Sequence, residues 1–468
     1  MTQDFDLMVV GGGPGGYTAA IRAAQLGLRT ALVERAELGG TCLNRGCIPV
    51  KVMLRAGRLA HEMRAAAEVG FDTSGVSFDI TALVAYRNEV SKTLSLGVDA
   101  LLKRHEVEVI SGTGRVAGPQ QVLVSDAAAG NAAGPGRRYT AGHIILATGS
   151  RPGSFPGVTA DGKRIWDFTH ALSPARLPAR LIVFGNQGLA FASIYGDLGT
   201  EVTFVVPTPT LIPYLDDELM SALADSLRDR GVTLRMNAEL GRVRASGDVV
   251  AVAITDSDGT HQLEGDTLIV VPDSIPNTDD IGLGEAGVET EPPYVKVDRW
   301  GQTNVESIYA IGDIAGQPGT ASKAFREGIL AAEHLAGVPG TRPLDKAWLP
   351  SYTSSRPAAV SIGITETQAR QSDRPVRVGR APFEVIGSAV ADGETTGYAK
   401  TISDDSTGEL LGAQIIGNDA TDLIPALSVL QHLEGADEDF AAVVMSHPSN
   451  AEALHEAVMA GLGRPLNQ

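Results

Sequence analysis

The two cysteines of the chain, Cys42 and Cys47, lie in one short segment with four residues between them. Two thiols at this spacing can form a redox-active disulfide, bind a metal ion, or be neighbours by chance. A structural disulfide is uncommon in a large cytosolic chain. A metal site needs more ligands than two thiols, and the neighbouring sequence offers no others. Cysteine content alone leaves the choice between these interpretations open.

The geometry of a disulfide restricts the backbone between these cysteines. Five residues of regular helix rise roughly 7.5 Å, whereas bridged cysteines have Cα atoms roughly 4.4–6.8 Å apart. Cys42 and Cys47 therefore cannot be bridged across an undistorted helix. We expect the segment to bend at Gly46 or at Ile48, which precedes a proline.

A glycine-rich segment offers a second kind of chemistry. Gly11-x-Gly13-x-x-Gly16 follows an apolar run and opens a helical pattern. Such glycines let the backbone turn tightly and approach a pyrophosphate at the N-terminus of the helix. Glu34 ends the next strand-like run, where an acidic side chain can bind a ribose hydroxyl. The pattern predicts nucleotide binding, although the same glycines could serve packing alone.

The segment from Leu38 to Lys51 reads LGGTCLNRGCIPVK. It closely resembles the dihydrolipoyl dehydrogenase branch of the pyridine nucleotide–disulfide oxidoreductase family, whose pattern is GGTCLNxGCIPSK, and only Val50 clearly departs from it. Further matches are Ala147-Thr148-Gly149-Ser150, IYAIGD at 308–313, LLGAQIIG at 410–417 and His447-Pro448-x-x-x-Glu452. The resemblance covers nearly the whole chain and implies a disulfide oxidoreductase that carries FAD.

The resemblance assigns FAD contacts to residues in the first three quarters of the chain. Asp313 is expected to meet the ribityl chain and Lys51 to lie near the flavin ring. The full expected set is Gly11, Gly13, Gly16, Glu34, Gly40, Thr41, Lys51, Gly114, Thr148, Gly149, Asp313 and Ala321.

The resemblance also assigns catalytic roles. Cys42 is expected to be the thiol that exchanges with the substrate sulfur, and Cys47 to lie against the flavin as a thiolate. Thiol exchange needs a base, and the expected base is His447, with Glu452 orienting its other ring nitrogen. In this family the histidine comes from the second subunit, so the resemblance implies a homodimer with a shared active site. Without that context, His447 would be a loop histidine before a proline.

The nicotinamide-binding motif of the family is altered in this chain. The family pattern is GGGxIGxE, and residues 185–192 here read GNQGLAFA. Aligned from the strand side, Gln187 replaces the glycine that lets the pyrophosphate approach. Aligned from the helix side, Val183 replaces the turn glycine. In either alignment an alanine, Ala190 or Ala192, replaces the glutamate that normally faces Lys51.

Two further positions depart from the nicotinamide pattern. The acidic strand end has become Val206, and a Gly-Arg pair near the end of the domain has become Asp273-Ser274. No arginine nearby could hold a 2′-phosphate instead. Together these changes predict that binding of NAD or NADP is weakened or lost.

The elements expected around these motifs define an α/β fold. Two strand–glycine–helix units start near residues 6 and 181, and buried strands are expected at His143–Ala147 and Ser307–Ile311. A flexible loop is expected at Ala127–Gly136. The predicted domains are an FAD-binding domain (1–155 and 276–345), a Rossmann-like NAD-type domain (156–275) and an α+β dimerisation domain (346–468). In the last we expect strands at Ala389–Thr401 and Leu410–Ile416, and helices at Thr421–Leu433 and Glu452–Leu462.

The composition of the chain limits the kinds of molecule that we expect it to bind. The net charge of −18 opposes binding to nucleic acid and to anionic membranes, which need clustered Lys and Arg. The 43% hydrophobic content is that of an ordinary soluble protein. No apolar run could span a bilayer, and the acidic start, Met1 to Asp6, is not a secretory signal. We therefore expect a cytoplasmic protein.

Three functional hypotheses are consistent with these motifs. The first is a dithiol oxidase that passes electrons from FAD to oxygen, a quinone or another protein without nicotinamide. The second is an NAD-linked dihydrolipoyl dehydrogenase. The third is a non-catalytic flavoprotein partner, against which the intact set of Cys42, Cys47, Lys51, His447 and Glu452 counts. The dithiol substrate could be lipoyl, another small dithiol or a carrier-bound thiol.

Overall fold

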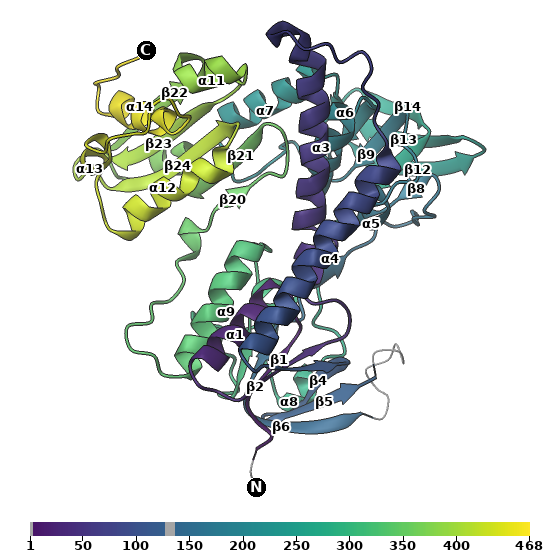
Figure 1. Cartoon of the computed structure of the whole chain (residues 1–468), viewed down its shortest axis with the longest axis vertical. Helices are drawn as coiled ribbons and strands as arrows, with labels where there is room; N and C mark the ends of the chain where they lie inside the picture. The colour runs from purple at the N-terminus through teal and green to yellow at the C-terminus, as the bar shows by residue number, and fades with distance from the viewer. Residues whose placement is uncertain (1–2, 127–135) are drawn as a thin grey trace. The chain divides into compact units, whose positions relative to one another are not determined.

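A computed structural model describes residues 3–126 and 136–468 (Figure 1). Residues 127–135 of the expected flexible loop lie outside the described residues, as do Met1 and Thr2. The chain forms two compact units. Unit 1 comprises Met1–Val52, Ala82–Gly153 and Asp273–Asp345, and unit 2 comprises Met53–Thr81, Ser154–Pro272 and Lys346–Gln468. The predicted mixed α/β architecture is confirmed.

Unit 1 is built on a sheet with a parallel core. The strand order is β3-β2-β1-β6-β5-β4, and β19 pairs in parallel with β6 on the side away from β1. Strands β4 and β5 are antiparallel additions. The bounds are β1 Phe5–Val10, β2 Thr30–Glu34, β3 Glu108–Ser111, β4 Thr113–Gly118, β5 Gln121–Ser125, β6 Arg137–Leu146 and β19 Ile308–Ala310.

Both faces of this sheet are buried, because alternate residues of each strand point to opposite faces. In β1, Leu7 and Val9 pack in the hydrophobic cluster that includes residues of the covering helices, whereas Met8 and Val10 pack in the cluster of the β4–β5 side. The helices are α1 (Pro14–Gln25), α4 (Ile80–Arg104) and α9 (Ala321–Leu335). Figure 1 shows α1 and α9 side by side, and a Cβ on Gly328 would lie 2.4 Å from the Gly15 carbonyl oxygen.

Shorter elements complete unit 1. Helix α1 begins at Pro14, one turn earlier than the apolar pattern predicts, because proline is well suited to the first position of a helix. The remaining elements are α2 Gly40–Asn44, the start of α3 (Cys47–Ala65), β7 Ser150–Pro152, β16 Ser274–Pro276, α8 Leu283–Ala286, β17 Thr290–Glu291, β18 Tyr294–Val295 and the 3₁₀ turn η4 Gly312–Ala315.

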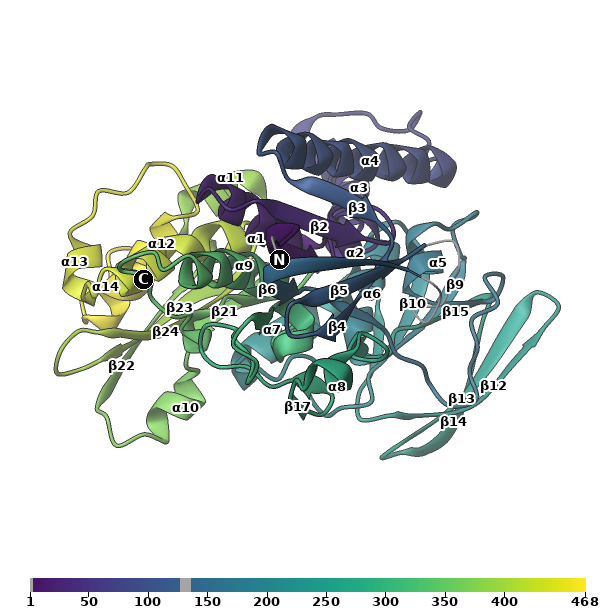
Figure 2. The same ribbon diagram turned by 90° about the horizontal axis from the view of Figure 1, so that it is seen from below.

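Unit 2 contains a second parallel sheet, in the order β11-β10-β9-β15-β8. It also contains a three-stranded antiparallel sheet, β12-β13-β14, whose strands lie side by side in Figure 2. Helices α5, α6 and α7 connect the parallel strands. The bounds are β8 Ile165–Trp166, α5 Phe168–Leu172, β9 Arg180–Phe184, η3 Asn186–Gly188, α6 Leu189–Asp197, β10 Glu201–Val205, α7 Asp217–Asp229, β11 Thr233–Arg235, β12 Glu239–Ser246, β13 Val249–Asp256, β14 Gly259–Gly265 and β15 Thr267–Val270.

The C-terminal part of unit 2 is an antiparallel sheet in the order β20-β21-β24-β23-β22, with helices against it. The strand expected over Ala389–Thr401 is wrong before Tyr398, where β23 begins, since Ala389–Asp392 is helical. Gly393, with φ of +70°, ends that helix before the strand begins. The bounds are β20 Ser351–Tyr352, β21 Ala358–Gly363, α10 Glu366–Arg370, β22 Val376–Pro382, α11 Gly387–Asp392, β23 Tyr398–Asp404, β24 Leu410–Gly417, α12 Ala420–His432, α13 Asp437–Ala441 and α14 Glu452–Gly461.

Buried ion pairs join the two parts of unit 2. The Asp197 carboxylate, 1% exposed, accepts hydrogen bonds from Arg230 Nη1 at 2.9 Å and from Arg356 Nε at 2.9 Å. The buried Lys400 ammonium lies 2.8 Å from Asp216. Removing one member of such a pair would leave an uncompensated buried charge. In the described part of the chain, no helix combines the length and apolar character that a membrane span requires.

Candidate functional site

The predicted FAD residues all belong to unit 1, and most follow the carboxyl ends of its parallel strands. Gly11 follows β1, Glu34 ends β2, Thr148 and Gly149 follow β6, and Asp313 follows β19. Since these strands are parallel neighbours, their ends lie along one edge of the sheet. This edge is where open α/β sheets bind ligands.

The Gly11–Gly16 turn has the shape of a phosphate cradle. Gly11 has φ of +107°, and a Cβ there would lie 2.3 Å from the Ala147 carbonyl oxygen. A Cβ on Gly16 would lie 1.8 Å from the Gly11 oxygen, so both glycines are required by packing. Gly13 differs, because its Cβ would meet only Gly40 Cα, at 3.9 Å. Gly13 also begins α1 without a side-chain cap, which leaves the first N–H groups of the helix facing this space. The residues present therefore fit the pyrophosphate of FAD.

The remaining predicted FAD residues support the same edge. Glu34 accepts hydrogen bonds from the Gly12 N–H at 2.6 Å and the Ala36 N–H at 2.8 Å, which fixes the carboxylate at the strand end. Gly114 packs against the end of the sheet, since a Cβ added at this position would lie 3.0 Å from the Val10 side chain. Gly40 and Thr41 begin α2, the exposed Lys51 lies in α3, and Ala321 begins α9.

Two supporting residues were missed by sequence reasoning. The Ser150 hydroxyl donates to Asp313 Oδ2 at 2.6 Å. Asn277 bonds with Thr148 in both directions, at 2.9 Å each: Thr148 Oγ1 donates to the Asn277 carbonyl and Asn277 Nδ2 donates to the Thr148 carbonyl. Ser150 belongs to the quoted Ala147–Ser150 motif, which was the one available signal, whereas nothing in the local sequence marks Asn277.

The cysteine pair lies where the helix is interrupted. Cys42 is in α2, which ends at Asn44, and Cys47 begins α3. The intervening Arg45 has φ of −140°, so the bend lies at Arg45 and Gly46, and Ile48 is already helical. Both cysteines are free thiols in the structure, Cys42 half-buried and Cys47 exposed.

The two thiols differ in acidity. The hydrogen bond from Cys42 lowers the pKa of the Cys47 thiol, although the protein atoms that shield its sulfur from water, in a residue that is exposed as a whole, oppose the shift. The same hydrogen bond, together with burial, raises the pKa of Cys42. Burial, with a smaller effect from Cys42, raises the pKa of the Tyr17 phenol to about 12, so this neighbour is neutral at physiological pH. Cys47 is thus suited to be a thiolate, and Cys42 needs an external base to ionise.

The predicted base and its partner belong to unit 2. His447 Nδ1 lies 2.9 Å from Glu452 Oε1, and Glu452 Oε2 accepts the Ser449 N–H at 3.0 Å. The hydrogen bond with His447 lowers the pKa of Glu452, which keeps this carboxylate ionised. The His447 side chain is 77% exposed, so the rest of its ring is available to another molecule. The structure thus brings His447 and Glu452 together, in a unit that does not contain the cysteines.

The second strand–turn–helix unit has a shorter turn than the first. The Gly185 N–H donates to the Val205 oxygen as the Gly11 N–H does to Val33, and a Cβ on either glycine would lie 2.3 Å from a neighbouring carbonyl. Gly185 is therefore the counterpart of Gly11. Gly188 is the counterpart of Gly16 when the two helices are aligned at the glycines that follow them, Gly199 and Gly27, and a Cβ on Gly188 would lie 2.5 Å from Val183. Two residues lie between Gly185 and Gly188, against four between Gly11 and Gly16.

The shortening removes the counterpart of Gly13. A 3₁₀ turn, Asn186–Gly188, stands in its place, and Asn186 Oδ1 accepts a hydrogen bond from the Thr208 hydroxyl at 3.0 Å. The strand register places Val206, 0% exposed, where Glu34 stands in the first unit. Counted from Gly188, the position of the family glutamate is Ala190, also buried.

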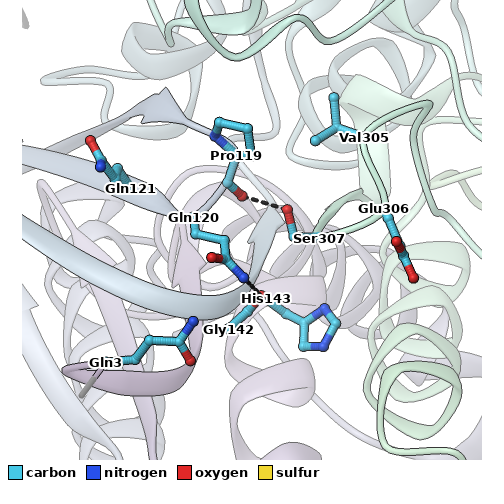
Figure 3. A pocket seen from close by; sticks show the side chains of 9 residues that line it. All are labelled: Gln3, Pro119, Gln120, Gln121, Gly142, His143, Val305, Glu306 and Ser307. Carbon is cyan, nitrogen blue, oxygen red and sulfur yellow. Dashed lines mark hydrogen bonds between the residues drawn. The ribbon is translucent and has the colours of Figure 1, made fainter. Parts of the chain in front are cut away.

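A separate hollow in unit 1 lies beside residues that precede β1 and β19, at the opposite ends of the strands from the glycine turn (Figure 3). Its lining includes the Ser307 hydroxyl, which donates to the Pro119 oxygen at 2.5 Å, and Gln120, whose amide donates to Gly142 at 3.3 Å. Burial lowers the pKa of His143 there. These groups are remote in topology from the cysteines and are not part of the candidate site. Among the described residues, no cluster of His, Cys, Asp or Glu side chains could hold a metal ion.

Comparisons with known proteins agree with this geometry. The family model described as pyridine nucleotide-disulphide oxidoreductase matches residues 5–328, and its dimerisation domain matches residues 349–458. The chain is 40% identical to dihydrolipoyl dehydrogenase of Zymomonas mobilis, over all of both chains. Among solved structures, LpdA from Mycobacterium tuberculosis is 27% identical with a TM-score of 0.89, covering 97% of this chain and 98% of that one. The HOCl-induced flavoprotein disulfide reductase RclA from Escherichia coli is 25% identical with a TM-score of 0.85, covering 97% and 99%.

Proposed function

Because the chain belongs to the pyridine nucleotide–disulphide oxidoreductase family, we propose that it oxidises a dithiol to a disulfide through the Cys42–Cys47 pair and FAD. The observation that carries this proposal is the pair itself. The two cysteines flank a helix break in the unit that contains the phosphate cradle, and each thiol shifts the pKa of the other, in opposite directions. The relatives named dihydrolipoyl dehydrogenase favour a lipoyl-type dithiol as the substrate.

The exchange balances with the residues present. One substrate thiolate attacks the Cys42 sulfur of the oxidised pair, which forms a mixed disulfide and releases Cys47 as a thiolate. The second substrate thiolate then attacks the substrate sulfur that is bonded to Cys42. This step completes the substrate disulfide and releases Cys42 as a thiolate. His447 of a second subunit takes the substrate proton, and Glu452 holds its ring. FAD, when bound, accepts the electron pair from the reduced cysteines.

The electron acceptor after FAD separates two forms of the proposal. The names of the relatives favour an NAD-linked dihydrolipoyl dehydrogenase. The short Gly185–Gly188 turn and the buried Val206 support the other form, a dithiol oxidase that passes electrons to oxygen, a quinone or a protein. The comparisons favour the first form over the second, which rests on the short turn and on Val206.

One experiment distinguishes these forms. The purified holoenzyme is reduced anaerobically with dihydrolipoamide, and NAD⁺ or air is then added while the flavin absorbance is followed. Rapid reoxidation by micromolar NAD⁺, with sluggish reaction in air, establishes the NAD-linked enzyme. Reoxidation by air or a quinone but not by NAD⁺ establishes the oxidase. A flavin that is not reduced by the dithiol, while Cys42→Ser and Cys47→Ser proteins behave as the parent does, would mean that the chain is a non-catalytic flavoprotein.

The base is tested separately. His447→Ala should lower dithiol turnover by roughly 10²–10⁴-fold, the usual contribution of a positioned acid–base group. The loss should shrink as pH rises, because the substrate thiols then ionise unaided. His455→Ala is the matched control, since that histidine lies on α14 and bonds the Ala441 carbonyl. Equal rates for His447→Ala and the parent at neutral pH would exclude His447 as the base.

A further inference from the structure

Helix α9 carries a lysine with no solvent exposure, Lys323. Its ammonium donates to the Gly312 carbonyl and to the Gly316 carbonyl, at 2.8 Å each. Glu327, one turn later, lies 3.3 Å from the same ammonium and accepts the Gly312 N–H at 2.7 Å. The pair thus makes three hydrogen bonds to the backbone at the two ends of the η4 turn.

The η4 turn has a backbone that needs such support. Gly312 has φ of +73° and Gly316 has φ of +108°, and glycine reaches many other conformations at little cost. Asp313 lies between them in the turn. A buried ammonium is costly unless it is paired and hydrogen-bonded, so Lys323 strongly favours the one backbone conformation that presents both carbonyls. The pair therefore selects the turn conformation in which Asp313 has its observed position.

Asp313 is the residue through which this selection reaches the chemistry. Its carboxylate accepts the Ser150 hydroxyl at 2.6 Å. Its charge also acts on Cys47: it opposes ionisation of that thiol, against the larger effect of the Cys42 hydrogen bond that lowers the Cys47 pKa. A displaced Asp313 would change both the hydrogen-bonding group offered to FAD and the electrostatic field at Cys47.

We propose that Lys323 and Glu327 form an ionic clamp that positions Asp313, and that this clamp contributes to the affinity for FAD. Both are positioning residues, since neither needs to touch the substrate. The inference rests on the proposed function for the role of Asp313 beside FAD. The proposed role differs from a general contribution to folding, because the hydrogen bonds of Lys323 and Glu327 end on the turn that carries Asp313.

The test compares two charge-neutralising changes on the same helix. Glu327→Gln removes the counter-ion of Lys323 but keeps an amide oxygen for the Gly312 N–H. Glu333→Gln removes another ion pair of α9, the one in which Arg22 Nη2 lies 2.7 Å from Glu333, far from the η4 turn. FAD retention is measured on the holoenzyme by equilibrium dialysis, and the pH dependence of Cys47 alkylation is measured on the dithiol-reduced protein.

We expect Glu327→Gln to weaken FAD binding by about tenfold, because a displaced Asp313 would lose about one hydrogen bond from its carboxylate to FAD. It should also shift the pH profile of Cys47 alkylation, whereas Glu333→Gln should leave both unchanged. Glu327→Asp should restore part of each. Equal FAD affinity and an unaltered Cys47 profile in Glu327→Gln would overturn the clamp, as would equal losses in Glu333→Gln at a matched melting temperature.

Lys323→Met provides the stronger perturbation, and Lys323→Arg its conservative counterpart. If Lys323→Met does not fold, the Glu327 variants still decide the question. Neither readout requires dithiol turnover. A chain that oxidises no dithiol, whether NAD⁺ or oxygen is offered as the acceptor, would therefore disprove the proposed function and leave the clamp measurable.

Discussion

The strand–turn–helix units β1–α1–β2 and β9–α6–β10 have the same strand register and end their first strands in equivalent glycines. They differ in the turn between that glycine and the helix. The first turn keeps Gly13, which packing does not require, and the second turn is two residues shorter and lacks its counterpart. Both keep the glycines that packing requires, Gly11 and Gly16 in one unit and Gly185 and Gly188 in the other.

This difference separates two roles of glycine that a single motif combines. A glycine whose Cβ would overlap a carbonyl oxygen is required by the fold in either unit, whether or not a ligand binds. A glycine whose Cβ would meet open space is required only by the group that occupies that space. The second unit retains the first kind and has lost the second.

The largest expected effect is on FAD binding. Gly13→Ala should fold, because Gly13 has φ of −73° and room for a Cβ, but the methyl group should obstruct the pyrophosphate. We expect about a hundredfold weaker FAD binding, equivalent to losing two or three backbone hydrogen bonds. Gln187→Ala in the second turn is the control and should change nothing. Flavin absorbance per folded chain measures both, and normal flavin content in Gly13→Ala would remove the distinction between the turns.

The second turn can be rebuilt with the length and residues of the first, which tests whether the lost residues restore dinucleotide binding. Replacing Asn186-Gln187 with Gly-Gly-Pro-Gly and changing Val206→Glu gives the second unit the turn length and acidic strand end of the first. We expect NADH affinity to rise by roughly tenfold or more, through restored backbone and ribose contacts. Val206→Glu alone should not raise it. Fluorescence titration with NADH measures the change, and tight binding by the unmodified chain would contradict the comparison.

The segment that follows the first of these units carries the thiol pair, and both cysteines of the chain lie there, in α2 and at the start of α3. Cys42→Ala removes the hydrogen bond that lowers the pKa of Cys47, so that pKa should rise and less thiolate should be present at neutral pH. Cys42→Ser keeps a hydroxyl donor and should retain part of the shift. The pH profile of alkylation in the dithiol-reduced protein measures both variants. If the profile of Cys42→Ala lay at lower pH than that of Cys42→Ser, the assigned hydrogen bond would be wrong.

The smallest expected effect is on stability. Asn186→Ala removes the bond from Thr208 that closes the second turn, and should lower the free energy of unfolding by about 0.5–1.5 kcal/mol. In a Thr208→Val background the same change should cost much less, because the bond is already absent. Urea denaturation measures both. Additive losses in the double variant would show that the two side chains do not interact.

The local sequence is sufficient to predict several features of this protein. The Gly11–Gly16 turn, the strand that leads into it and the Cys42–Cys47 pair are contiguous segments, so residue type and spacing specify them with little help from distant contacts. The need for a helix break between the cysteines also comes from local geometry, and the structure places that break at Arg45 and Gly46. The prediction for Ala389–Thr401 is wrong in part because an apolar run suits a buried strand or a short helix equally well, and only packing decides.

Tertiary structure decided the features that depend on residues far apart in the chain. The sequence left two alignments of the Gly185 segment open. In the structure the Gly185 N–H bonds to β10, and Gly188 packs against β9. The strand-side alignment is therefore correct at Gly185 and the helix-side alignment at Gly188, because the turn between them is shorter. The Ser150–Asp313 bond and the burial of Lys323 against the η4 backbone likewise join separate elements. A polar side chain becomes a positioning group only when folding removes it from water and leaves one set of partners, and no local pattern records that change.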